Sequence, residues 1–163
     1  MIKYLFIVRH AKSSREDPTL PDWKRPLNEE GRKRAERISK ILKQKNILPD
    51  KFISSHAVRA YDTALIFAAK LGYPDKKIGV SKNIYEQQVP ALIEVIRSTD
   101  KSCSSLMIFG HNPGFTDLYN YLSGENISKL STSAVACLTF DVKEWKQIGK
   151  GLGKIKFIET GKS

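Results

Sequence analysis

Cysteine and long apolar runs are scarce in this chain. Only Cys103 and Cys137 are present, without a CxxC pair or a nearby histidine cluster, which argues against a disulfide framework or a cysteine-rich metal site. The apolar run near the N-terminus, residues 4–8, stops at Arg9 and is too short for a membrane span or a secretory signal. We therefore expect a cytoplasmic protein with reduced thiols and no membrane partner.

Nucleotide-binding loops and clear metal-ligand sets are also missing. Neither GxxxxGK[ST] nor GxGxxG occurs, and the glycines within 149–153 precede a strand-like segment, which favours a turn. His10, His56 and His111 have no nearby cysteine partners, and the arginines close to them would repel a cation. The sequence therefore predicts neither a metal ion nor an organic cofactor.

Positive charge is what the chain has in excess. It contains 28 Lys and Arg against 17 Asp and Glu, a net charge of +11, within 163 residues that we expect to form a single domain, 1–163. Most of the excess lies in residues 31–45 and 143–163. Neither segment has interleaved aromatic residues, so a solvated basic surface is favoured and nucleic acid is an unlikely partner. The positive net charge nevertheless favours an anionic ligand or partner.

Strand-like and helix-like segments alternate along the whole chain. This order predicts an α/β fold, a three-layer α/β/α sandwich with a mostly parallel central sheet. Its ligand should lie at the carboxyl ends of the strands. The expected strands are 3–9, 51–54, 77–80, 105–110, 134–141 and 154–159. One helix is expected to begin after Asn28, and three more are expected over 57–71, 91–97 and 115–122.

Local signals mark the ends of two expected helices. Asn28 can cap a helix whose apolar positions 35, 38, 41 and 42 follow helical spacing, and this helix should end before Pro49. Gly72 is placed to end the helix over 57–71. The polar segment 11–26 contains three prolines and is predicted to be a long loop, of a length that is often functional.

Arginine and histidine collect where the expected strands end. Arg9 and His10 end the first strand, Arg59 lies one helical turn beyond the second, and His111 follows the strand over 105–110. Arginine offers planar, bidentate donors and stays charged at every working pH. Cationic and hydrogen-bond-donating groups that converge on one crevice match the oxygens of a phosphoryl group.

Four motifs carry a resemblance to a known family. They are RHAKS at 9–13, RPL at 25–27 followed by Gly31, SSHAVRAYDTA at 54–64, and GHNPG at 110–114. In this order they resemble the histidine phosphatase superfamily, which has the phosphoglycerate-mutase-like fold. The short chain looks most like the small phosphohistidine phosphatase branch, the SixA type, which has no cap domain.

The resemblance implies catalytic roles for particular residues. His10 would be the nucleophile that forms a covalent phosphohistidine. Arg9, Arg59 and His111 would hold the oxygens of the transferring phosphoryl group. Glu86 is the candidate general acid, although a phosphoramidate substrate could be cleaved without one and Glu86 could simply be a glutamate at the N-terminus of a helix, where the helix dipole favours it.

The remaining candidates concern substrate contacts. Lys12, Ser13 and Asn112 are the candidate substrate-binding residues, while Lys12 and Ser13 could equally be loop residues that face water. His56 stands where the family commonly has proline and is expected at the rim of the site.

Three functions compete at this point. The first is a metal-independent phosphatase that acts through His10, with phosphohistidine in a protein as substrate. The second has the same chemistry with a small phosphorylated metabolite, and the third is a non-catalytic phosphate-binding module. A mutase is not expected, because retention of a bisphosphate needs more enclosing structure. We expect a monomer.

Overall fold

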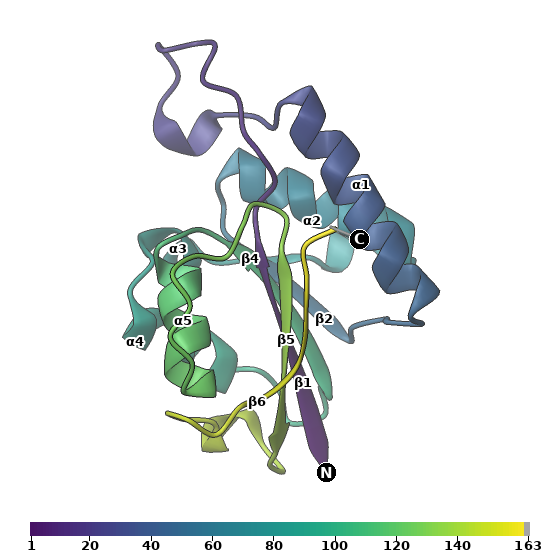
Figure 1. The fold of residues 1–163 in the computed structure, drawn as a ribbon, viewed down its shortest axis with the longest axis vertical. Helices are drawn as coiled ribbons and strands as arrows, with labels where there is room; N and C mark the ends of the chain where they lie inside the picture. The colour runs from purple at the N-terminus through teal and green to yellow at the C-terminus, as the bar shows by residue number, and fades with distance from the viewer. Residues whose placement is uncertain (162–163) are drawn as a thin grey trace.

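The computed structural model describes residues 1–161 and shows a six-stranded sheet with the order β3-β2-β4-β1-β5-β6 (Figure 1). β1, β2, β3 and β4 pair in parallel, whereas β5 runs antiparallel to β1 and β6 antiparallel to β5. The strands are β1 Ile2–Arg9, β2 Lys51–Ser54, β3 Gly79–Val80, β4 Ser105–Gly110, β5 Val135–Asp141 and β6 Lys154–Glu159. The helices are α1 Glu29–Gln44, α2 Val58–Leu71, α3 Lys82–Glu86, α4 Val89–Arg97 and α5 Gly114–Ser123, with 3-10 turns η1 Asp22–Lys24, η2 Asp75–Lys77 and η3 Trp145–Gln147.

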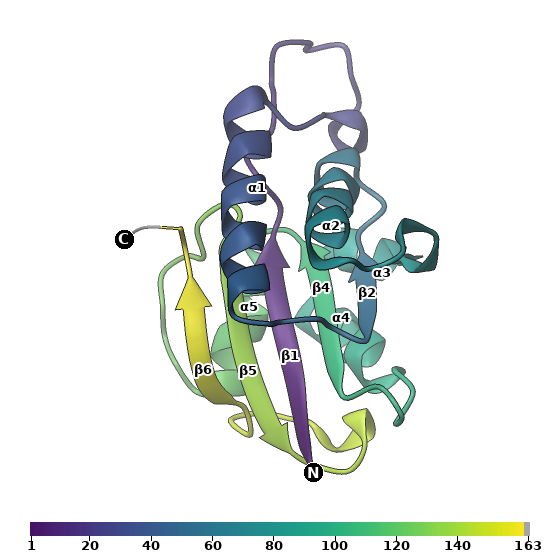
Figure 2. The same ribbon diagram turned by 90° about the vertical axis from the view of Figure 1, so that its right-hand side faces the viewer.

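Helices cover both faces of the sheet, as Figure 2 shows for α1 and α2 in front and α4 and α5 behind. The central strand β1 is apolar on both sides because alternate side chains point to opposite faces. Leu5 and Ile7 are buried in the core beneath α4 and α5, and Phe6 and Val8 in the core beneath α1 and α2. The predicted three-layer sandwich with a mostly parallel sheet is confirmed.

The helix-end signals work as expected. The Oδ1 atom of Asn28 accepts a hydrogen bond from the Gly31 backbone N–H at 2.7 Å, which caps α1. Gly72 ends α2 in the left-handed conformation with φ of 77°. The first helix ends at Gln44, before Pro49, and its basic side chains lie on the exposed side.

The structure adds elements that the sequence pattern did not predict. Within the expected long loop, η1 forms a turn that rises beyond the carboxyl ends of β1 and β4 (Figure 2). The helix α3 has five residues, too few to produce a helical period in the sequence. By contrast, the strand expected over 154–159 is confirmed as β6, an edge strand that pairs with β5 within the basic C-terminal segment. No helix within residues 1–161 is long and apolar enough to cross a bilayer.

The parallel strands place their last residues side by side. Arg9 pairs with Gly110 across β1 and β4, and Ser54 pairs with Phe109 across β2 and β4. The residues that follow β1, β2 and β4, among them His10 and His111, therefore meet at one edge of the sheet.

Candidate active site

His10 lies directly after β1 and is 9% exposed. Its backbone N–H donates to the Gly110 carbonyl at 2.9 Å, and its carbonyl accepts from the Ser133 N–H at 3.2 Å. The ring atom Nδ1 lies 2.7 Å from the carbonyl oxygen of Ala11. A carbonyl can only accept, so Nδ1 carries the proton and the lone pair is on Nε2. The Ala11 N–H in turn donates to Thr63 Oγ1 at 2.9 Å, which holds this carbonyl in place.

The surroundings of His10 keep the ring neutral. Burial lowers the pKa of His10 to about 4, and the positive charges of Arg59, Arg9 and Arg25 act in the same direction, while the Ala11 carbonyl opposes them. A neutral ring retains the Nε2 lone pair at neutral pH. His10 is therefore available as a nucleophile.

Arg59, which is buried, and Arg9, which is half-buried, bring two guanidinium groups to the site. Arg59 Nη1 donates to the backbone oxygen of Asp22 at 2.8 Å and Nη2 to its Oδ2 at 2.9 Å, while Arg9 Nη1 donates to the Leu130 carbonyl at 2.9 Å. The Nε atoms of both arginines are buried and have no hydrogen-bond partner within the described chain. Because an unpaired buried N–H is costly, these two groups are open to a ligand acceptor.

His111 adds another donor next to His10. The two ring centroids are 5.2 Å apart. His111 Nε2 lies 2.8 Å from Ser55 Oγ, whereas Nδ1 is buried without a partner in the part of the chain described. Burial lowers the pKa of His111 to about 3, with a further contribution from the nearby His10 ring. If the Ser55 hydroxyl donates to Nε2, the single ring proton is on Nδ1 and is free for a ligand oxygen.

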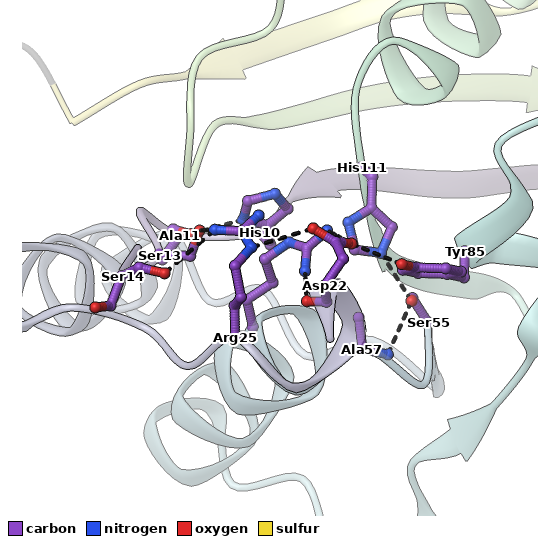
Figure 3. Close-up of polar contacts among 11 residues, drawn as sticks. His10, Ala11, Ser13, Ser14, Asp22, Arg25, Ser55, Ala57, Tyr85 and His111 are labelled. Atoms are coloured by element: carbon purple, nitrogen blue, oxygen red, sulfur yellow. Dashed lines mark hydrogen bonds and ion pairs between the residues drawn. The ribbon is translucent and has the colours of Figure 1, made fainter. Parts of the chain in front are cut away.

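Asp22 connects the two sides of the site (Figure 3). In addition to Arg59, its carboxylate accepts from Arg25 Nε at 3.1 Å and from the Tyr85 hydroxyl at 2.6 Å. Burial alone would raise the pKa of Asp22, but the hydrogen bonds from Tyr85, Arg59 and Arg25 and the charge of Arg59 outweigh it and lower the pKa far below its usual range. Asp22 is thus ionised, and it ties η1 to α2 and α3.

The four principal candidates from the sequence, Arg9, His10, Arg59 and His111, meet at this edge of the sheet. Ser13 is also close, since its Oγ accepts from Arg25 Nη1 at 2.7 Å.

The other candidates contact different groups. Lys12 forms an exposed ion pair with Glu30 at 2.9 Å. Asn112 uses both parts of its amide within the protein, donating to the Leu130 carbonyl and accepting from Thr116. Glu86 is exposed and is the last residue of α3, so its expected place at a helix N-terminus is wrong. No hydrogen bond or ion pair within residues 1–161 joins it to the site. Its role as an acid stays a prediction.

Sequence reasoning assigned no role to Asp22, Arg25, Ser55 or Tyr85. Arg25 belongs to the RPL motif and Ser55 follows the end of a predicted strand, so the sequence could have indicated a place in the site for both. Nothing in the sequence indicated Asp22 or Tyr85, because η1 and α3 are too short to show a helical period. The two residues that form this hydrogen bond are also 63 positions apart.

The geometry fits one kind of ligand. The neutral His10 ring lies next to His111, and the Nε atoms of Arg9 and Arg59 and Nδ1 of His111 are buried without a partner in the described chain. Several donors around one nucleophile suit a tetrahedral oxyanion such as a phosphoryl group. Within residues 1–161, no group of three or more His, Cys, Asp or Glu side chains is placed to hold a metal ion.

Comparisons with known proteins agree with this geometry. The model of the histidine phosphatase superfamily, branch 1, matches residues 5–113. An uncharacterized chloroplastic protein of Arabidopsis thaliana is 30% identical over 151 residues, which cover 88% of this chain and 69% of the plant protein.

Two solved structures share the fold. The protein histidine phosphatase SixA, in complex with tungstate, superposes with a TM-score of 0.84 at 22% identity and 97% coverage of both chains. A mycobacterial glucosyl-3-phosphoglycerate phosphatase superposes with a TM-score of 0.68 at 13% identity, covering 96% of this chain and 98% of the other. The matched region 5–113 contains Arg9, His10, Arg59 and His111. The chain therefore belongs to the histidine phosphatase superfamily, and its fold is the phosphoglycerate-mutase-like fold of SixA.

Proposed function

We propose that this protein is a phosphatase that acts through a covalent phosphohistidine on His10. The observation that carries the proposal is the neutral His10 ring, with its lone pair on Nε2, among the buried and unpaired Nε atoms of Arg9 and Arg59 and Nδ1 of His111. A non-catalytic binding module would need the donors but not an available nucleophile. The arginines supply the positive charge that the reaction needs, so the proposal is metal-independent.

The reaction proceeds in two displacements. The lone pair of His10 Nε2 attacks phosphorus, the bond from phosphorus to the leaving atom breaks, and that atom keeps the electron pair. The oxygen of water then attacks phosphorus, the N–P bond breaks, its electron pair returns to Nε2, and both protons of water leave with the product as dihydrogen phosphate. The donors of Arg9, Arg59 and His111 stabilise the charge on the equatorial oxygens, and removal of one such donor costs on the order of 3 kcal/mol.

The proposed substrate is phosphohistidine in a protein. The similarity in fold to a protein histidine phosphatase supports this choice. A small phosphorylated metabolite is the alternative, which the similarity to a glucosyl-3-phosphoglycerate phosphatase favours. A panel of both substrate types, compared by kcat/KM, separates the two.

Trapping of the intermediate tests the mechanism. Wild type, His10→Asn and the control Lys33→Gln, whose side chain is 76% exposed on α1, are mixed with a radiolabelled phosphoryl donor and quenched in base. We expect acid-labile, base-stable label on wild type and Lys33→Gln and none on His10→Asn. Label on His10→Asn, or phosphate binding without turnover by wild type, would contradict the proposal.

A further inference from the structure

Aromatic rings form a continuous row from the surface to the nucleophile. Trp23 of η1 lies 5.8 Å from His56, His56 lies 4.9 Å from Tyr85, and Tyr85 lies 5.4 Å from His111, measured between ring centroids. The His111 ring is next to His10. The rings come from the long loop, the turn before α2, and α3, so only the tertiary structure assembles them. We call Trp23, His56 and Tyr85 the aromatic rim.

The aromatic rim is partly open to solvent. Trp23 is 40% exposed, and Lys24 Nζ lies 5.2 Å from its ring centroid. His56 and Tyr85 are half-buried, and His56 Nδ1 is buried with no partner in the described chain. Core aromatic residues bury their rings fully and satisfy their polar atoms. The rim therefore has ring surface and a polar atom to offer a ligand.

The position of the rim relative to His10 bears on the leaving group. In an in-line displacement the leaving atom is on the side of phosphorus opposite to the attacking His10 Nε2. Figure 3 shows Asp22, Tyr85 and His111 together on one side of His10. Because His10 is buried and Trp23, at the other end of the row of rings, is exposed, a leaving group that points from phosphorus toward solvent on this side would meet the rim.

The charges beside the rim restrict the leaving group further. The Asp22 carboxylate accepts hydrogen bonds from Arg59, Arg25 and Tyr85, so it has no proton to give. An alkoxide leaving group needs a proton as its bond to phosphorus breaks. A phosphorylated imidazole that is protonated on its distal nitrogen needs none, because the electron pair of the P–N bond goes to the ring and neutral imidazole departs.

We propose that the aromatic rim is a leaving-group subsite that stacks against a flat, imidazole-type ring. This inference deepens the proposed function and rests on the same nucleophile. Tyr85 is the central residue, since it contacts both His56 and His111 and its hydroxyl is held by Asp22. The subsite selects for the ring of the leaving group, whereas Arg9 and Arg59 bind the phosphoryl group common to all substrates.

Three phosphoryl donors with different leaving groups test the subsite. Phosphoimidazole has a flat nitrogen ring, phosphoramidate has only ammonia, and phenyl phosphate has a ring that leaves as an anion. Tyr85→Phe lacks the hydroxyl that donates to Asp22 but keeps the ring, so it is the reference for Tyr85→Leu. Relative to Tyr85→Phe, we expect Tyr85→Leu to lower kcat/KM for phosphoimidazole about tenfold more than kcat/KM for phosphoramidate, through KM. Trp23→Ala should act in the same direction with a smaller effect. Tyr85→Phe, which keeps the ring, and Lys33→Gln should retain the preference for phosphoimidazole over both other donors.

Two results would overturn the subsite. The first is an equal loss of kcat/KM for phosphoimidazole and phosphoramidate in Tyr85→Leu, which would mean that the ring only positions His111. The second is no loss of kcat/KM for either donor. A wild type that prefers phenyl phosphate to phosphoimidazole would also overturn the imidazole specificity.

A binding measurement separates failure of the subsite from failure of the proposed function. If wild type turns over none of the donors, the proposed function fails. Calorimetric titration of His10→Ala protein then gives the ratio of Kd values for phosphoimidazole and phosphoramidate without any reaction. The subsite predicts a ratio that favours phosphoimidazole and falls about tenfold when Tyr85→Leu is added. An unchanged ratio refutes it.

Discussion

Acid should destabilise the folded protein through His10. The unfolded chain has the ordinary histidine pKa of 6.5, and burial lowers the folded pKa to about 4. As the pH falls below 6.5 the unfolded state binds the proton first, so the contribution of His10 to stability is present at neutral pH and is lost toward pH 4. Between about pH 7.5 and about pH 4.5, linkage gives a loss of about 2.5 kcal/mol from this one ring.

Urea unfolding of wild type and His10→Asn at both pH values measures this contribution. Carboxylates and His111 titrate in both proteins, so their effects largely cancel in the comparison. We expect the free energy of unfolding of wild type to fall by about 2 to 3 kcal/mol more than that of His10→Asn. Equal losses in the two proteins would show that His10 titrates normally in the folded state and that burial does not keep its ring neutral.

Three further substitutions test other parts of the site. Arg59→Lys should lower kcat/KM about a hundredfold, because an ammonium cannot replace the planar, bidentate guanidinium; steady-state kinetics with near-normal activity would contradict this. Ser55→Ala should lower kcat about tenfold and leave the proton of His111 divided between its two nitrogens, and an unchanged nitrogen NMR tautomer pattern would count against that role. Gly31→Ala should lower both Tm and activity, because its Cβ would lie 2.2 Å from the Lys12 carbonyl oxygen; an unchanged Tm would show that the loop after His10 yields freely.

Local patterns were enough to predict the sheet and to single out the principal candidate residues that meet at its edge. The short apolar run before Arg9 identified β1, and the run before His111 identified β4. Parallel pairing then requires that the residues after these strands meet at one edge. The prediction of Glu86 as acid used position alone, and the structure places that side chain in solvent, so the prediction has gained no contact in its support.

The contact between Asp22 and Tyr85 is one that local sequence patterns could not predict. Their hydrogen bond joins η1 to α3, two segments too short to have a period of their own. Their positions depend on how the long loop and α3 pack around the ends of the strands. No spacing in the chain encodes such a contact.

The chain by itself therefore determined the layered fold, the edge of the sheet where the candidate site lies, and the candidate residues Arg9, His10, Arg59 and His111, because strand periodicity and residue chemistry are local properties. The tertiary structure alone decided which nitrogen of His10 has the lone pair, which guanidinium atoms are unpaired, and how Asp22 and the aromatic rim surround the site. These features depend on hydrogen bonds and ring contacts between distant segments, and such contacts exist only after the sheet and its loops have assembled.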